Sequence, residues 1–71
     1  MNAFQARGTN GSVIAPTAKE AAILFFAEYP KARKCDINEG TQDGRFFEVA
    51  YGRNVTTLKL KDVTKKMIDT L

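Results

Sequence analysis

The sequence contains no histidine and only one cysteine among its 71 residues. Histidine is the commonest general base near neutral pH and the commonest metal ligand. The single cysteine, Cys35, excludes an intrachain disulfide and suits a reducing compartment. Its alternating apolar context predicts a buried structural thiol and not a nucleophile. These absences indicate a non-enzymatic protein that works without a metal or cofactor.

Long apolar runs are also missing. The longest, residues 21–27, is far shorter than the ~20 residues that a membrane span requires. Near the N-terminus, Arg7 and a Gly/Asn cluster precede any apolar run, which is not the pattern of a signal peptide. We therefore expect a cytoplasmic protein with no membrane association. The length predicts a single compact domain, residues 1–71.

Two known motifs of ligand-binding sites are not matched by the sequence. Read as a calcium loop from Asp36, the sequence places Thr41 where glycine is required and Phe47 where the bidentate Glu belongs. Residues 8–11 (Gly-Thr-Asn-Gly) lack the Lys-Ser/Thr pair of a phosphate-binding P-loop. Both segments therefore predict turns or polar loops.

The first 15 residues predict a β-hairpin. Residues 3–7 alternate, with Phe4 and Ala6 opposite Gln5 and Arg7, as expected of a strand with one apolar face. Asn-Gly at 10–11 is a strong hairpin signal because both residues tolerate positive φ. Residues 12–15 would then form the returning strand.

A helix is predicted over residues 17–29. Thr17 and Glu20 have the spacing of a capping box, and Pro30 ends the helix by removing a backbone donor. Its apolar stripe consists of Ala18, Ala21, Ala22, Phe25, Phe26 and Tyr29. Ile23 and Leu24 flank this stripe, so the apolar arc is wider than one sheet face usually covers. Core packing accounts for the stripe, and a helix-mediated dimer interface at Ile23 and Leu24 is the alternative.

The second half of the chain predicts further strands. Residues 34–39 alternate with Cys35 and Ile37 inward, and the polar loop 40–44 leads to an aromatic strand over residues 45–51. In that strand one face carries Phe47, Val49 and Tyr51, which we expect to pack beneath the helix.

The C-terminal part is less regular. Residues 55–60 favour a strand because of their β-branched content. Asp62 is predicted as the N-cap of a short helix whose Val63, Met67 and Leu71 share a face. This helix would lie either beside the first helix or on the other face of the sheet.

Together these elements predict an α+β fold. The order β-β-α-β-β-(β)-α gives a small two-layer domain with a mainly antiparallel sheet and helix 17–29 on one face. Its central strand residues would be Phe4, Val13, Cys35, Ile37, Phe47, Val49 and Tyr51.

Positive charge is concentrated in two clusters. Eleven Lys and Arg against eight Asp and Glu give a formal charge of +3. One cluster, Lys31, Arg33 and Lys34, follows the predicted helix, and the other consists of lysines within residues 59–66. Such clusters are usually solvated surface; in the functional interpretation they attract nucleic acid or an acidic protein.

The leading functional hypothesis is a non-enzymatic binding protein that acts by occlusion on a nucleoprotein or protein target. Compact, mildly basic α+β proteins of this length are typical of accessory proteins of phages and plasmids, including those of anti-CRISPR type; this analogy is one of size and architecture only. The residues expected to bind the macromolecule are Lys31, Arg33, Lys34, Arg45, Phe46 and Arg53.

Two alternatives stand beside this hypothesis. Single-stranded nucleic acid would bind the basic aromatic strand, with Phe46 or Tyr51 stacking on bases. Alternatively, the protein is a homodimeric structural or regulatory module that associates through Ile23 and Leu24.

Overall fold

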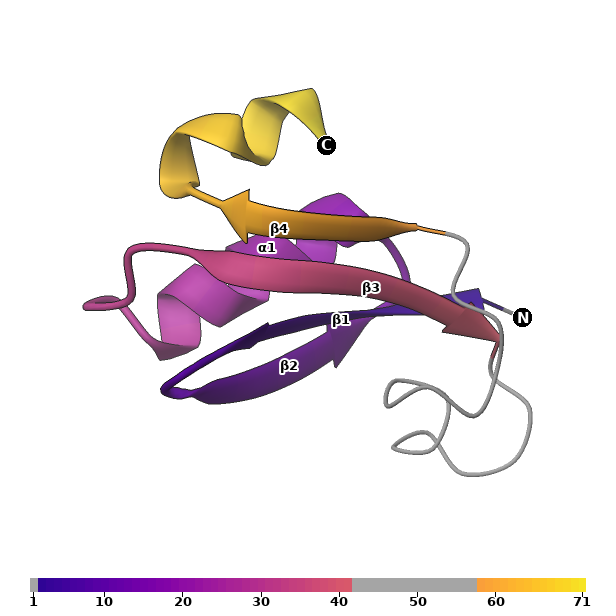
Figure 1. Ribbon diagram of the computed structural model, residues 1–71, viewed down its shortest axis with the longest axis horizontal. Helices are drawn as coiled ribbons and strands as arrows, with labels where there is room; N and C mark the ends of the chain where they lie inside the picture. Colours follow the sequence, from indigo (N-terminus) through magenta and orange to yellow (C-terminus); the bar gives the residue numbers. More distant parts are fainter. Residues whose placement is uncertain (1, 42–57) are drawn as a thin grey trace.

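The computed structural model describes residues 2–41 and 58–71. In chain order the elements are β1 (Asn2–Gly8), β2 (Gly11–Ala15), α1 (Ala18–Glu28), β3 (Cys35–Thr41), β4 (Lys59–Val63) and the 3₁₀ helix η1 (Lys65–Thr70). The four strands form one antiparallel sheet in the order β2-β1-β3-β4. The α1 helix covers one face of this sheet (Figure 1). The predicted α+β class and the order β-β-α-β-β are therefore confirmed.

The α1 helix begins and ends where the sequence predicts. The Thr17 hydroxyl accepts a hydrogen bond from the backbone N–H of Glu20 at 3.1 Å, as in a capping box. At the other end, the N–H of Tyr29 donates to the Phe25 carbonyl at 2.8 Å, and Pro30 follows. The buried residues of α1 are Ala21, Ala22, Phe25 and Phe26. These residues belong to the predicted stripe.

The core lies between α1 and the sheet. Its buried members are Ala6, Ala15, Ala21, Ala22, Phe25, Phe26, Cys35, Ile37 and Val63. The four alanines allow the helix backbone to approach the sheet closely, and the Phe25 and Phe26 rings fill the space beside them in an edge-to-face pair at 5.3 Å. Phe4 and Val13 pack against this core, as predicted. The predicted core residues Phe47, Val49 and Tyr51 lie outside the described residues.

The face of the sheet opposite α1 is more buried than its sequence suggests. Gln5 lies in β1, between Ile14 of β2 and Asn38 of β3 in the strand register. Its side chain is only 1% exposed, and its amide has no hydrogen-bond partner among the described residues. Ala3, on the same face, is also buried. Alternation alone therefore identified the faces of β1 but not their burial.

The C-terminal part differs from its prediction. The last described strand is β4, Lys59–Val63; it shares residues 59–60 with the predicted strand 55–60, of which residues 55–57 lie outside the described residues. Asp62 is a strand residue with φ of 57° and not an N-cap. The reason is tertiary: Val63 is fully buried opposite Cys35, and this burial outweighs the local capping preference of Asp62. Thr64 precedes the following helix.

That helix, η1, is a short 3₁₀ segment and not an α-helix. It lies beside α1, which decides between the two predicted placements (Figure 1). The Lys65 ammonium is 5.9 Å from the centre of the Phe26 ring, and Ile68 and Leu71 pack against the core. Met67, which was predicted to share a face with Val63 and Leu71, is 38% exposed. Six residues form too few hydrogen bonds to stabilise a helix without such contacts.

The first strand of the predicted second hairpin is longer than the sequence predicts. β3 continues through Gly40 to Thr41, where the sequence predicted a loop. Among the described strands, β3 pairs with β1 on one side and β4 on the other. The predicted aromatic strand 45–51 lies outside the described residues.

Two glycines allow the aromatic residues of α1 to approach the first hairpin. A Cβ at Gly8 would lie 2.8 Å from the Phe25 ring, and one at Gly11 would overlap the Tyr29 hydroxyl. Gly11 also has φ of 153°, which side chains of L-residues rarely permit. None of the described helices is long and apolar enough to cross a membrane.

Replacing Gly11 with alanine is therefore expected to destabilise the fold by about 2 kcal/mol. The backbone strain at this φ and the steric overlap with Tyr29 both contribute to the loss. Urea denaturation followed by circular dichroism measures the loss. Ser12→Ala, one residue further along β2, is the control and should change stability by less than about 0.5 kcal/mol. Equal stability of the two variants would contradict the close approach.

Candidate functional site

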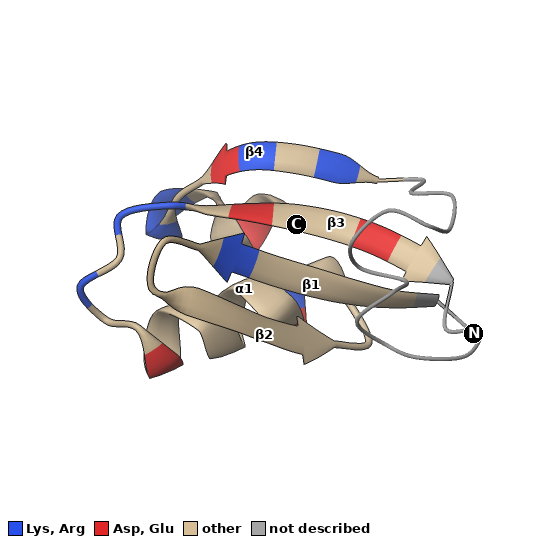
Figure 2. Cartoon of the chain, turned by 60° about the horizontal axis from the view of Figure 1, so that its bottom comes forward, with Lys and Arg blue, Asp and Glu red and all other residues tan. Residues whose placement is uncertain are grey.

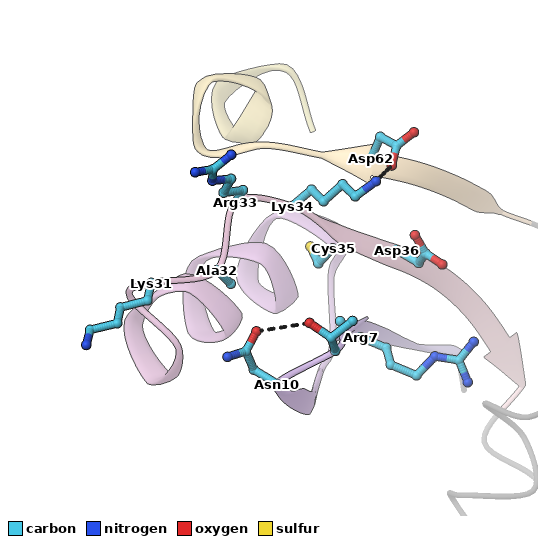
Figure 3. A pocket seen from close by; sticks show the side chains of 11 residues that line it. Arg7, Asn10, Lys31, Ala32, Arg33, Lys34, Cys35, Asp36 and Asp62 are labelled. Atoms are coloured by element: carbon cyan, nitrogen blue, oxygen red, sulfur yellow. Dashed lines mark hydrogen bonds and ion pairs between the residues drawn. The ribbon is translucent and has the colours of Figure 1, made fainter.

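An open pocket of about 630 Å³ lies at the end of the sheet where three segments meet (Figure 3). These are the β1–β2 turn, the loop 31–34 between α1 and β3, and the end of β4. The described residues that line it are Arg7, Gly8, Thr9, Asn10, Lys31, Ala32, Arg33, Lys34, Cys35, Asp36 and Asp62. Four cationic side chains thus share the pocket with two carboxylates.

The loop 31–34 is held in place by its backbone. The N–H of Ala32 donates to the Tyr29 carbonyl at 3.0 Å, and the Lys65 ammonium donates to the Pro30 carbonyl at 3.0 Å. Ala32 packs against the core, whereas the side chains on either side of it, Lys31 and Arg33, are exposed. Of the four loop side chains, Ala32 packs inward, whereas Lys31, Arg33 and Lys34 are exposed.

The exposed cations do not converge on one point. Figure 3 shows Lys31 and Arg33 extending away from one another, while Lys34 turns toward β4. Charges spread along a rim match an extended polyanion better than a single small anion, because the side chains are directed to different sides.

Lys34 is paired with Asp62 of β4. Its ammonium lies 2.8 Å from an Asp62 carboxylate oxygen, and the two side chains are 65% and 69% exposed. The hydrogen bond and the charge attraction raise the pKa of Lys34 and lower the pKa of Asp62. Water screens so exposed a pair, so it contributes little to stability. Its main effect here is to neutralise part of the positive charge at the pocket.

Arg7 also lines the pocket, although the sequence analysis did not select it. It lies in β1 directly opposite Asp36 of β3, and opposite charges at such positions attract. The feature of the sequence that could have indicated Arg7 is its position immediately before the turn at residues 8–11. Its proximity to loop 31–34 depends on β1–β3 pairing, which links segments about 30 residues apart and leaves no local trace in the sequence.

Cys35 forms part of the pocket wall but is only 1% exposed. Burial, and secondarily the nearby charge of Asp36, raise the pKa of the Cys35 thiol to about 11 from its usual 9.0. The thiol is therefore protonated at neutral pH and is a poor nucleophile. This agrees with its predicted structural role.

The raised pKa makes stability depend on alkaline pH. The unfolded chain loses the Cys35 proton near pH 9 while the folded chain keeps it to about 11, so the thiol's contribution is complete below pH 9 and declines as pH rises to 11. We expect this loss to be about 2–3 kcal/mol. Cys35→Ala is less stable at pH 7, and the gap to the wild type should narrow between pH 9 and 11 in urea denaturation. A constant gap would contradict this assignment.

The predicted binding residues divide into two groups. The structure brings Lys31, Arg33 and Lys34 together at the pocket. Arg45, Phe46 and Arg53 lie outside the described residues. Ile23 and Leu24 are 47% and 48% exposed on α1 and do not line the pocket.

The second basic cluster approaches the first. Lys65 contacts the residue before loop 31–34 through the Pro30 carbonyl. Figure 2 shows basic segments on that loop, at the end of β1 and along β4, so positive charge extends beyond the pocket. We refer to Arg7, Lys31, Arg33 and Lys34 together as the basic end.

Within the described residues, no group of three or more His, Cys, Asp or Glu side chains is placed to hold a metal ion. Comparisons of the chain with protein-family models, curated proteins and solved structures give no significant match.

Proposed function

We propose that this protein is a non-enzymatic binding protein that docks its basic end on an anionic surface of a nucleoprotein or protein and acts by occluding that surface. The observation that carries the proposal is the gathering of Arg7 from β1 with Lys31, Arg33 and Lys34 from the α1–β3 loop around one open pocket. Such a mode of action suits an accessory protein of a phage or plasmid, of the anti-CRISPR type.

The spread of charge supports an extended partner. Lys31 and Arg33 point in different directions from a loop whose backbone is fixed by hydrogen bonds at both Ala32 and Pro30. A preordered set of cations loses less conformational entropy on binding than a flexible tail would. Long-range attraction to a polyanion also speeds the encounter and weakens with salt.

Capture from a lysate of host cells, with and without nuclease, tests the class of target. A partner retained after nuclease treatment and released by salt supports an acidic protein surface, whereas a partner lost with nuclease supports nucleic acid or a nucleoprotein. Capture that Lys31→Glu with Arg33→Glu leaves unchanged would refute the role of the basic end.

Removing the carboxylate of Asp62 is expected to strengthen polyanion binding by about 2–5-fold, because the pocket loses a negative charge and Lys34 loses its partner. Asp62→Asn suits the positive φ at this position, since asparagine tolerates that conformation. Fluorescence anisotropy with a labelled oligonucleotide and with polyglutamate measures the change. Asp69→Asn is the control: it makes the same charge change on η1, away from the pocket, and should have less than a twofold effect.

Direct binding of single-stranded nucleic acid is a second candidate function, favoured by the same basic end. It additionally requires aromatic side chains that stack on bases, and the proposed ones, Phe46 and Tyr51, lie outside the described residues. Loss of oligonucleotide binding in Phe46→Ala, with polyglutamate binding retained, would favour this candidate over occlusion of a protein.

Homodimerisation is a third candidate. The observation in its favour is the exposure of two large apolar side chains on α1, 47% for Ile23 and 48% for Leu24. These exposed side chains are the ones through which the sequence predicts association.

A further inference from the structure

The two edges of the sheet differ in charge. In the order β2-β1-β3-β4, β2 and β4 are the edges of the described sheet. β4 carries Lys59 and Lys61, and its Asp62 has a positive φ beside an irregular register with β3. Charges and irregularities of this kind protect an edge against pairing with another strand. β2, Gly11–Ala15, contains no proline. It also has no charged residue, as Figure 2 shows.

The register of the first hairpin indicates which backbone groups of β2 face outward. Gly8 and Gly11 close a two-residue turn, and hydrogen-bonded pairs then recur at every second position, at Ala6 with Val13. The N–H and C=O groups of Ser12 and Ile14 consequently point away from β1. In an antiparallel pair of β2 strands centred on Val13, Ser12 of each copy lies opposite Ile14 of the other. This single register supplies a partner for all four outward groups.

The α1 helix places an exposed apolar side chain above the same edge. Phe26 lies on the flank of α1 that faces η1, as its contact with Lys65 shows. At about 100° per residue, Leu24 lies on the opposite flank, which overhangs β2, whereas Ile23 lies on the flank of Phe26. The 48% exposure of Leu24 is therefore on the side of the uncharged edge.

Leu24 is also at the right height along the strand. Tyr29 lies over Gly11, and α1 runs antiparallel to β2 (Figure 1). Leu24 is five residues before Tyr29, or about 7.5 Å along the helix, which equals about two residues of strand. The ring of Phe25, the residue next to Leu24, reaches Gly8, which is the register partner of Gly11, so Leu24 lies alongside the first half of β2, between the levels of Gly11 and Val13.

We infer that β2 pairs antiparallel with β2 of a second copy of this chain, forming a dimer with one continuous sheet in which Val13 lies at the symmetry axis and Leu24 lies beside it. A second copy fits because a two-fold interface must be self-complementary, and an uncharged edge meets itself without repulsion. The β4 edge would instead bring lysines together. A five-residue edge is small for a specific interface, so the dimer is expected to be weak and concentration-dependent.

This inference specifies the homodimer alternative and does not depend on the basic end. Sedimentation equilibrium of the full chain from about 5 μM to about 1 mM tests it, and we expect a monomer–dimer equilibrium in that range. Leu24→Lys and Ile14→Lys should each weaken dimerisation at least about tenfold. Ile23→Lys is the matched control, with nearly equal exposure on the other flank, and should change it less than about twofold.

Amide hydrogen exchange gives a second measurement that does not rely on substitutions. The amides of Ser12 and Ile14 should become more protected as protein concentration rises, whereas the Val13 amide, already paired with β1, should change little. A monomer throughout the range, or equal weakening by Ile23→Lys and Leu24→Lys, would overturn the inference. A monomer that still binds polyanions would leave the proposed function intact, and a dimer that does not bind them would leave this inference intact.

Discussion

Reversing two charges of the basic end, by Lys31→Glu with Arg33→Glu, is expected to weaken binding to a polyanion by about 100-fold or more at low salt. Each cation that contacts the polyanion releases condensed counterions, so two fewer contacts lower both the affinity and its dependence on salt. Both side chains are exposed, and neither belongs to the core. Fluorescence anisotropy with a labelled oligonucleotide and with polyglutamate measures the loss, and circular dichroism verifies that the variant is folded.

A charge-matched variant separates the site from the overall charge. Lys19→Glu with Lys59→Glu changes the formal charge by the same amount, at two exposed lysines that do not line the pocket. We expect the affinity of this variant for the polyanion to fall by less than about tenfold, because only long-range attraction is weakened. If both double variants lose affinity equally, the binding depends on net charge and the basic end has no special role.

Phe25→Ala is expected to have the largest effect on stability, a loss of about 3–5 kcal/mol. The Phe25 side chain is fully buried, lies against the Phe26 and Tyr29 rings, and reaches Gly8 of the first hairpin. Truncation leaves a cavity between α1 and the sheet. Domains of this size have total stabilities of about 4–11 kcal/mol, so a large share of the folding free energy would be lost.

Urea denaturation at 25 °C measures this loss, and Ile23→Ala on the exposed flank of α1 is its control. Because Ile23 is 47% exposed, we expect its truncation to cost less than about 1 kcal/mol. A loss below about 1 kcal/mol for Phe25→Ala would mean that the helix does not pack on the sheet as described.

The parts of the fold that could be predicted are those with strong local signals. Residues 8–11 mark the first turn, although its central residues are Thr9 and Asn10 and not the predicted Asn10 and Gly11. Thr17 with Glu20 caps α1, and Pro30 ends it. Each signal acts within a few residues, so the sequence alone contains it.

The parts that could not be predicted depend on distant contacts. β4 continues to Val63, beyond the predicted end at residue 60, because Val63 is buried opposite Cys35, a contact between residues nearly 30 positions apart. The same pairing brings Asp62 to Lys34. The burial of Gln5 likewise depends on the strands on either side of it. No local preference of these residues signals such contacts.

The candidate site was likewise predictable only in part. The cluster Lys31, Arg33 and Lys34 is contiguous in sequence and is exposed because the helix ends just before it. Arg7 and Asp62, which complete the pocket, are brought there by the strand order β1-β3-β4. Charged residues that are neighbours in the sequence could be recognised from the sequence alone. Charged residues that become neighbours only through strand pairing could not.

The most direct test of the basic end is the affinity for a polyanion measured across a range of salt concentrations. With about three cations of the basic end engaged, log affinity for a single-stranded oligonucleotide should fall against log salt with a slope of about −2, and the loss of two of these contacts in Lys31→Glu with Arg33→Glu should reduce the slope to about −0.7. Polyglutamate should bind with the same trend. Failure of both probes to bind at low salt, or binding that salt does not weaken, would contradict the proposed docking surface.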